Sequence, residues 1–344
     1  MPVSIHEVAA RAGVSLGTVS KVLNNSLGAQ IAPGTKERVR VAARELGYYP
    51  SAVARALVRK QTDTLGVIFP DFDAQSPIRS GFFSLVFNEI LEAAHAREQD
   101  VTILSGRSWT NARESLPRYR DGRCDGYIVF FQFPGSDLIE AFLDNKVPFV
   151  LVNDSGDDPR LSCVDVDNRE SAFAATKYLL SLGHRRIAHL RGNMPDGPVA
   201  GRFLGYKDAI EGVGLSFDPR LSPTGDYSFE SVARRVSDLM EMPITERPTA
   251  LFCGADGMAS SAIRVLTRLG LRVPGDISVL GHDDLPEAAQ EHPALTTMRQ
   301  PFAQIGRAVV DDLLAVIGDI QSRGKKQFLG TELIVRDSTA EPAS

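Results

Sequence analysis

Apolar side chains recur at helical spacing through the first 60 residues of the chain. Segment 4–7 (Ser-Ile-His-Glu) has the S-x-x-E form of a capping box and precedes the first apolar stripe. Gly13 can end this helix, and Ser15 can cap a second helix that extends to about Asn24. The pattern therefore predicts two short helices joined by a tight turn.

A polar stretch at 24–30 separates this pair from a third predicted helix, with Pro33 in its first turn and Gly47 beyond its end. A short segment at 51–57 follows, with one apolar face made by Val53, Ala56 and Leu57. We therefore expect an all-α helix-turn-helix domain at 1–49, a short segment and linker at 50–61, and a larger domain at 62–344.

From Leu65 onward, short apolar runs alternate with amphipathic helices. Strand-like runs lie at 65–69, 101–104, 127–131, 149–152, 187–190, 250–253 and 277–280, and helical stretches at 171–182, 202–211, 258–269 and 302–317. Such alternation predicts doubly wound parallel sheets of the α/β class, and the 280 residues suffice for two lobes. Because ligands bind at the carboxyl ends of parallel strands, we expect a small molecule in a cleft between the lobes.

Composition narrows the class of protein. The 344 residues are 43% hydrophobic and 24% charged, which excludes a disordered tail, a collagen-like fibre and a disulfide-stapled miniprotein. Cys124, Cys163 and Cys253 lie far apart, as is typical of a reducing cytoplasm. The first residues lack a signal-peptide profile, and no stretch approaches the roughly 18 apolar residues of a spanning helix. We therefore expect a cytoplasmic protein without membrane contact.

Charge is divided unevenly along the chain. Residues 1–60 carry nine Lys or Arg against three Asp or Glu, a net charge of +6. The remaining residues carry 29 basic and 40 acidic side chains, a net charge of −11. This asymmetry favours a polyanionic partner for the N-terminal part, although a solvated basic face is the alternative.

The first two predicted helices have the spacing of a helix-turn-helix. The residues expected to pack them together are Val8, Ala9, Val14, Val19 and Leu23. The residues expected on the face that enters a major groove are Leu16, Gly17, Thr18, Ser20 and Lys21. A plain helical hairpin is the alternative, but the basic third helix favours binding to double-stranded DNA.

Nine motifs are spread over nearly the whole chain. They are 4–15 (SIHEVAARAGVS), 18–24 (TVSKVLN), 46–50 (LGYYP), 53–57 (VARAL), 183–188 (GHRRIA), 273–279 (VPGDISV), 281–284 (GHDD), 295–301 (LTTMRQP) and 332–336 (ELIVR). In order and spacing the sequence resembles the lactose/galactose-repressor (LacI/GalR) family of bacterial transcription regulators. The resemblance implies a two-lobed, periplasmic-binding-protein-like (type I) effector domain behind the helix-turn-helix.

The resemblance also implies which residues bind DNA. Leu16, Gly17 and Lys21 match base-reading positions, where Lys21 can contact either guanine or a phosphate and Leu16 a thymine methyl group. The segment within 50–61 matches the family's hinge helix and linker, and in it Leu57 matches a wedge that enters the minor groove, with an ordinary core role as the alternative. The full implied set is Ser15, Leu16, Gly17, Thr18, Ser20, Lys21, Asn24, Tyr48, Ala52, Val53, Ala56 and Leu57.

Two features depart from the family pattern. The connection from Asn24 to Pro33 is a few residues longer than usual. Ala32 stands where the family commonly has a capping Ser, and losing that cap costs a helix about 1 kcal/mol. Both features bear on the geometry of the DNA half-sites.

The resemblance further implies an effector site. Arg202 would donate to ligand oxygens, Asp283 would accept from ligand hydroxyls or amines, and Tyr227 would offer a stacking surface. The full implied set is Phe82, Trp109, Asn153, Arg202, Tyr227, Ala255 and Asp283. This set favours a carbohydrate, with a nucleobase or nucleoside as the alternative. An Arg202–Asp283 ion pair, and core or surface roles for Phe82 and Trp109, are the structural alternatives.

The sequence contains no catalytic motif in the structural context that catalysis requires. Segment 13–17 fits G-x-S-x-G, but it follows a predicted helix, whereas a nucleophile elbow follows a strand. The chain has no P-loop, no H-E-x-x-H and no paired-Cys motif, so we expect no enzyme, no metal and no cofactor. The tail after Arg336 has no leucine heptad, which favours a homodimer on a near-palindromic operator over a coiled-coil tetramer. A sugar-binding receptor without a DNA role is the alternative from another class.

Overall fold

The structure is a computed structural model that describes residues 3–24, 30–51, 56, 59, 61–69, 81–104, 112–131, 136–154, 158–194 and 197–343. The chain forms two compact units. The first comprises Met1–Asp63 with Gly122–Asp125, and the second comprises Thr64–Asp121 with Gly126–Ser344.

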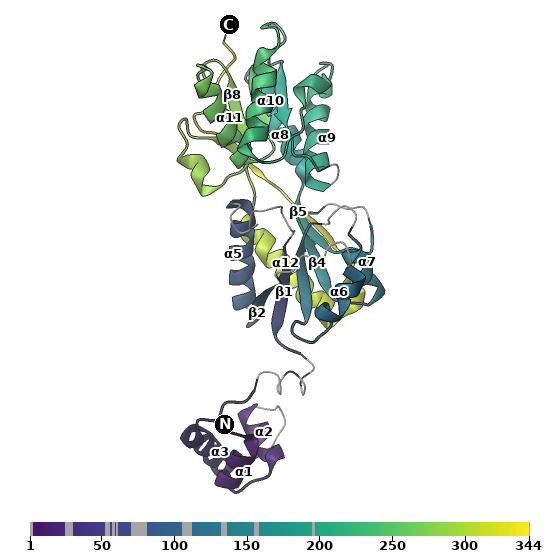
Figure 1. Ribbon diagram of the computed structural model, residues 1–344, viewed down its shortest axis with the longest axis vertical. Helices are drawn as coiled ribbons and strands as arrows, with labels where there is room; N and C mark the ends of the chain where they lie inside the picture. The colour runs from purple at the N-terminus through teal and green to yellow at the C-terminus, as the bar shows by residue number, and fades with distance from the viewer. Residues whose placement is uncertain are drawn as a thin grey trace. The chain divides into compact units, whose positions relative to one another are not determined.

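Within residues 3–24 and 30–51, the first unit contains the helices α1 (Ile5–Ala12), α2 (Leu16–Leu23) and α3 (Pro33–Leu46) (Figure 1). The local signals act as predicted. The backbone N–H of Ser4 donates to Glu7 Oε2 over 2.8 Å, and Gly13 adopts a φ of +64° that ends α1. Ser15 Oγ accepts the Thr18 N–H at the start of α2.

The core of this unit confirms the predicted packing. Val8, Ala9 and Val19 are buried, with Val14 and Leu23 packed against them. The structure adds buried residues that the pairwise pattern did not include, namely Ala12, Val22, Val39, Ala42 and Ala43. The third helix is therefore part of the same core, and the alternative of a plain two-helix hairpin is wrong.

The second unit contains two sheets (Figure 1). The first has strand order β10-β5-β4-β3-β1-β2, and its neighbouring strands pair parallel. Its strands are β1 (Thr64–Ile68), β2 (Asp100–Leu104), β3 (Gly126–Phe130), β4 (Phe149–Val152), β5 (Cys163–Val166) and β10 (Lys326–Leu329). The second has order β11-β9-β8-β7-β6, from β6 (Ile187–Leu190), β7 (Ala250–Cys253), β8 (Ser278–Asp283), β9 (Thr296–Arg299) and β11 (Glu332–Ile334).

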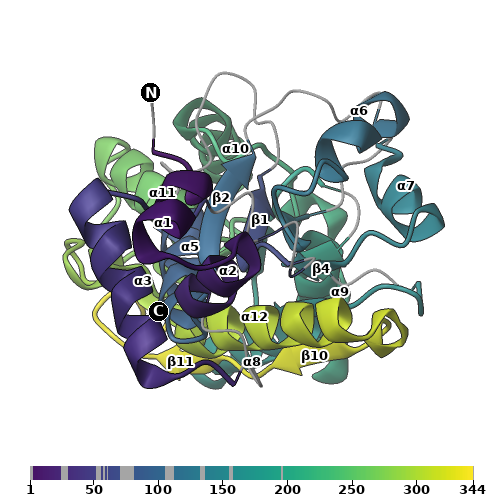
Figure 2. The same ribbon diagram turned by 90° about the horizontal axis from the view of Figure 1, so that it is seen from below.

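Helices cover both faces of each sheet. In the first lobe, α5 (Gly81–His95) and α12 (Phe302–Gly318) pack on one face and α6 (Ala112–Tyr119) and α7 (Leu138–Asp144) on the other (Figure 2). In the second lobe, α10 (Phe229–Glu241) and α11 (Asp256–Arg268) cover one face, and α8 (Asn168–Ser181) and α9 (Gly197–Gly212) the other. Short 3-10 turns lie at Pro219–Leu221, Pro286–Ala289 and Ile320–Ser322. The two-lobed α/β prediction is confirmed.

The chain passes between the lobes three times, from β5 to α8, from β9 to α12 and from β10 to β11. The sequence pattern missed four strands, β5, β9, β10 and β11, because polar residues interrupt their apolar runs. The predicted parallel pairing holds in both sheets except at β11, which pairs antiparallel with β9. The run predicted at 277–280 continues to Asp283 as β8.

None of the helices that the structure describes is long and apolar enough to cross a membrane.

Close packing of α8 against α9 depends on Gly205. A Cβ built there would overlap the carbonyl oxygen of Arg169. We expect Gly205→Ala to lower the free energy of unfolding by about 1–3 kcal/mol, measured by urea denaturation with circular dichroism. Gly212, at the end of the same helix, has open space around it, so Gly212→Ala is the matched control. Equal stabilities of the two variants would contradict this packing.

Candidate functional site

One side of α2 faces solvent. Leu16 is 39% exposed, Ser15, Gly17 and Lys21 are also exposed, and Val19 on the opposite side is fully buried. A Cβ at Gly17 would meet nothing closer than Ser15 Oγ at 3.9 Å. The helix therefore presents the predicted residues on an uncovered surface, with room at Gly17 for close approach of another molecule.

The polar residues that flank this surface already bond within the unit. Thr18 Oγ1 lies 2.9 Å from Ser15 Oγ, and Asn24 Nδ2 donates to Ser20 Oγ over 3.2 Å. The Asn24 Oδ1 atom is buried and has no partner among the described residues. These hydroxyls and amides stiffen the two ends of α2.

Tyr48 packs against the core of the three helices, whereas its neighbour Tyr49 is 85% exposed. Tyr49 is a surface aromatic residue that the sequence motif did not single out. Ala32 at the start of α3 makes no side-chain cap, and Pro33 occupies the first turn as expected.

Several predicted residues lie outside the described part of the chain, namely Ala52, Val53, Leu57 and Trp109. Ala56 is helical and half-buried.

In the second lobe, the predicted effector residues gather near the carboxyl ends of the parallel strands. Asp283 ends β8, and Ala255 follows β7 as the residue before α11. Arg191, which the motifs did not single out, directly follows β6, and its guanidinium lies 4.3 Å from the centroid of the Phe203 ring. This is the edge at which such sheets bind ligands.

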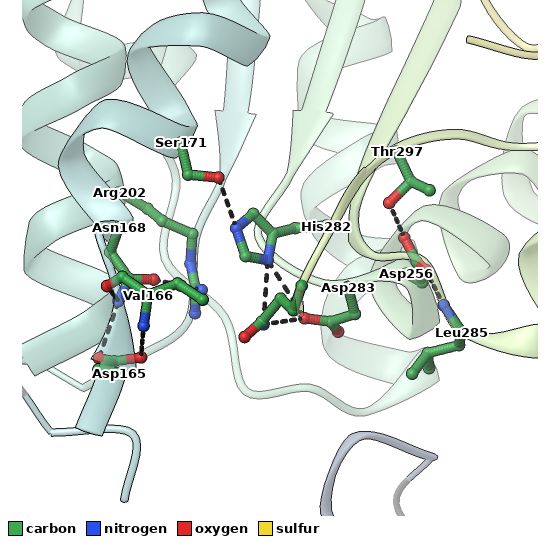
Figure 3. Close-up of polar contacts among 11 residues, drawn as sticks. Asp165, Val166, Asn168, Ser171, Arg202, Asp256, His282, Asp283, Leu285 and Thr297 are labelled. Carbon is green, nitrogen blue, oxygen red and sulfur yellow. Dashed lines mark hydrogen bonds and ion pairs between the residues drawn. The ribbon is translucent and has the colours of Figure 1, made fainter. Parts of the chain in front are cut away.

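Arg202 of α9 is 7% exposed and is held by the connection between β5 and α8 (Figure 3). Its Nη1 donates to Asn168 Oδ1 over 2.7 Å. Asn168 Nδ2 in turn donates to Asp165 Oδ2 over 2.9 Å, and the Val166 N–H donates to Asp165 Oδ1 over 2.7 Å. The arginine is therefore oriented by a buried amide and a buried carboxyl group.

Burial raises the pKa of Asp165 to about 7, because desolvation outweighs its hydrogen bonds and the nearby Arg202 charge. Burial and the neighbouring Asp283 likewise raise the pKa of Asp256. Asp256 accepts from the Thr297 hydroxyl over 2.6 Å and from the Leu285 N–H over 2.8 Å.

Asp283 is held by residues other than Arg202. Its Oδ1 lies 2.8 Å from Gln300 Nε2 and 3.2 Å from His282 Nδ1. Arg202 and Asp283 form no ion pair in the structure, in which both residues are described. The structural alternative of a mutual ion pair is therefore wrong.

Strained backbone marks the ends of several strands. Asp283 has a φ of +126° and Asp284 of +59°, while Asn153 after β4 and Phe131 after β3 have φ values of +58° and +62°. Asn153 is also 7% exposed. Such conformations persist only where the surroundings determine them, and they cluster at functional sites.

The aromatic candidates differ in their surroundings. Tyr227 is 47% exposed, yet its hydroxyl lies against Gly192, where a Cβ would overlap it, and desolvation raises the Tyr227 pKa. Phe82 of α5 packs edge-to-face on Phe83 and Phe302, with ring centroids 5.5 and 5.9 Å apart. Tyr227 is therefore half-exposed with its hydroxyl end covered, whereas Phe82 is partly engaged in the first lobe.

Sequence reasoning missed six buried polar residues near Arg202 and Asp283: Asp165, Asn168, Ser171, Asp256, His282 and Gln300. Five of them belong to the hydrogen-bond networks of Arg202 and Asp283, and Asp256 interacts with Asp283 through its charge. The available signal was that His282 and Gln300 lie inside the GHDD and LTTMRQP motifs and that Asp256 follows the predicted strand at 250–253. Asp165, Asn168 and Ser171 gave no such signal, because the strand before them was not predicted. Among the residues described, no group of three His, Cys, Asp or Glu side chains could hold a metal ion.

Comparison with known proteins agrees with this architecture. The family model for bacterial regulatory proteins of the lacI family matches residues 4–51, and a periplasmic binding protein-like domain matches residues 176–339. The HTH-type transcriptional regulator CelR of Thermobifida fusca is 33% identical over 340 residues, covering 97% of this chain and 98% of that protein. The HTH-type transcriptional repressor CytR of Escherichia coli (strain K12) is 32% identical, covering 98% and 96%.

Solved structures show the same fold. A complex of the regulator CelR with cellobiose has a TM-score of 0.74 at 30% identity, covering 98% of this chain and 99% of that one. The lac repressor dimer bound to operator and the anti-inducer ONPF has a TM-score of 0.82 at 28% identity, covering 99% and 100%. The chain belongs to the LacI family of bacterial transcriptional regulators.

The buried Asp165 predicts an unusual dependence of stability on pH. Its native pKa of about 7 lies above the unfolded value near 3.9, so the native state binds the extra proton between these limits. Rising pH from about 4 to 7 therefore destabilises the wild type relative to Asp165→Asn, by at most about 4 kcal/mol. Urea unfolding at several pH values measures this difference.

Asp276 provides a control of opposite sign. Hydrogen bonds from Arg272 lower its pKa to about 2, so the stability that Asp276 contributes is present above pH 4 and is lost as the pH falls toward 2.

The prediction for Asp165 would be contradicted if wild type and Asp165→Asn lost stability in parallel between pH 4 and 7. That result would mean that the pKa of Asp165 is not raised in the folded protein.

Proposed function

We propose that this regulator is a repressor that binds a near-palindromic operator as a homodimer and responds to a small polyhydroxylated effector, in the cytoplasm. The observation that carries the proposal is the pairing of an uncovered α2 surface in one unit with a prebuilt polar site in the other. A homodimer follows from the need to read two half-sites related by a two-fold axis.

The DNA-binding part comprises residues 1–49 with the linker 50–61. The exposed positions of Leu16, Gly17 and Lys21 support base contacts from α2. The net charge of +6 over residues 1–60 supports attraction to the phosphate backbone. The lac repressor structure bound to operator, which covers 99% of this chain, supports the same use of the fold.

The effector part comprises residues 62–344. Arg202 supplies a preoriented donor, Asp283 an acceptor and Tyr227 a half-exposed ring, which together suit the hydroxyl groups and the apolar face of a sugar. The CelR complex with cellobiose supports a carbohydrate.

A nucleobase or nucleoside is the second candidate, and Asn153 is the observation that favours it. Its buried amide at the end of β4 both donates and accepts, as the edge of a base requires. Tyr227 would then stack on the base rather than on a sugar ring.

Regulation follows from the three connections between the lobes. An effector that binds one lobe arrangement more tightly than another shifts the population toward it. That shift reaches the DNA-binding part through the linker 50–61 and changes operator affinity.

Lys21→Ala is expected to weaken operator binding at least tenfold, because it removes a cation from the surface proposed to enter the major groove. Fluorescence anisotropy at fixed salt with an operator-bearing fragment selected from genomic DNA measures the affinity. Lys177→Ala, in α8 of the other unit, removes the same charge and is the matched control. An unchanged operator affinity of Lys21→Ala would show that Lys21 does not make the proposed contact.

Arg202→Ala is expected to abolish effector binding while leaving operator affinity intact. A thermal-shift panel of cellobiose, other sugars, sugar phosphates and nucleosides measures binding, since a compound at about 100 times its Kd adds roughly 2.7 kcal/mol of stability. The control is Arg169→Ala, an exposed arginine of α8 paired with Asp208. A stabilising sugar supports the first candidate and a nucleoside the second, and a shift that survives in Arg202→Ala rejects the assigned site.

A further inference from the structure

A continuous chain of buried polar groups ends at Asp283. Ser171 Oγ lies 3.0 Å from His282 Nε2, and His282 Nδ1 lies 3.2 Å from Asp283 Oδ1 (Figure 3). Gln300 Nε2 donates to the same oxygen over 2.8 Å. All four residues are at most 5% exposed. The chain links α8, β8 and the segment between β9 and α12.

The geometry selects one tautomer of His282. Asp283 Oδ1 can only accept while the carboxyl group is ionised, so Nδ1 carries the proton and donates to it. Nε2 is then an acceptor, and the Ser171 hydroxyl donates to it. The approach of Gln300 Nε2 to Nδ1, at 3.5 Å, is longer than either of these contacts and joins two donors.

The surroundings keep this ring neutral. Burial and the nearby Arg202 charge lower the pKa of His282, and the adjacent Asp283 only partly opposes them. His189 of β6 also lies close enough to interact, and burial lowers its pKa to about 3. The groups that face His282 therefore favour a neutral donor toward Asp283.

Both donors engage the same oxygen of Asp283. No hydrogen bond between described residues reaches Asp283 Oδ2, and Gln300 Oε1 is a buried acceptor without a partner. Asp283 has a φ of +126°, a backbone conformation that persists only where surrounding contacts stabilise it. The Gln300 N–H adds a backbone bond to the Asp283 carbonyl over 3.2 Å.

We propose that His282 is a positioning residue: it holds Asp283 so that Oδ2 accepts a hydrogen bond from the effector. Ser171 fixes the tautomer of His282, and Gln300 donates to the same oxygen of Asp283 as His282 does. The proposal rests on the proposed effector site and deepens it. A ligand group at this point must be a hydroxyl or an amine, because an anionic oxygen would face a fixed carboxylate. Gln300 lies in a connection between the lobes, so the same network ties ligand recognition to the lobe arrangement.

Two nearly isosteric variants separate positioning from packing. His282→Asn places an amide nitrogen close to the position of Nδ1 and so retains the hydrogen bond to Asp283. In His282→Gln the longer side chain reaches toward Ser171, and the hydrogen bond to Asp283 is lost. We expect His282→Asn to bind the probe within about threefold of wild type and His282→Gln to bind it at least tenfold more weakly. The probes are cellobiose and adenosine, measured by isothermal titration calorimetry. Urea unfolding of each variant checks the fold.

A second measurement needs no ligand. Ring ¹⁵N shifts of the full chain should show His282 as the neutral Nδ1–H tautomer throughout pH 6–8, with His282→Asn used to assign the signal. Ser171→Ala should shift the Nε2 resonance. An Nε2–H tautomer, or protonation within this range, overturns the proposal.

The two proposals fail differently. If no sugar, sugar phosphate or nucleoside of the thermal-shift panel binds the wild type, the proposed effector classes fail, while the ring shifts still decide the role of His282. If a probe binds and the Asn and Gln variants have equal affinity, the positioning role is wrong although the effector site stands.

Discussion

The candidate site of the second unit depends on the burial of one positive charge. Arg202 is 7% exposed, and a buried guanidinium is tolerated only with hydrogen-bonding partners and a compensating negative potential. Asn168 Oδ1 supplies the hydrogen-bond acceptor, and Asp165, which holds Asn168, supplies negative charge when it is ionised. Asp165 lies in β5 of the first lobe, and Asn168 is the first residue of α8 in the second. The charge that makes the site suitable for an oxygen-rich ligand is therefore oriented by a segment shared between the lobes.

Close packing determines the geometry on the other side of the site, around Asp256 and the end of β8. A Cβ at Gly281 would overlap the Asp256 carboxylate, so only glycine lets that carboxylate accept from Leu285 and Thr297. Leu285 also contacts the start of α5, where a Cβ at Gly81 would lie 2.9 Å from its side chain. Acceptors at the end of β8 are thus connected to the first lobe by packing as well as by Gln300. Movement of one lobe relative to the other would disturb both Arg202 and Asp283.

Sequence reasoning succeeded where the determinants are local. The capping box at Ser4, the left-handed Gly13 and the Ser15 cap act within one or two turns of helix, and the structure has each of them as predicted. It failed where a strand is stabilised by its neighbours. Strand β5 contains Asp165, and β9 begins with two threonines, so neither shows the apolar run that marks a buried strand. Pairing with β4 and β8 nevertheless places both in the sheets.

The sequence by itself determined the helix-turn-helix and the alternation of strands and helices that follows it, because periodicity and caps are written along the chain. Arg202 and Asp283 became candidates for one site only through the resemblance of the sequence to its family. Only the tertiary structure decided that these two residues do not pair and that Asn168, His282 and Gln300 orient them. Those partners lie 17 to 34 residues away in sequence, or adjacent on a strand whose alternate side chains face opposite ways. Burial creates their energetic importance, and it is a property of the folded molecule rather than of any local stretch.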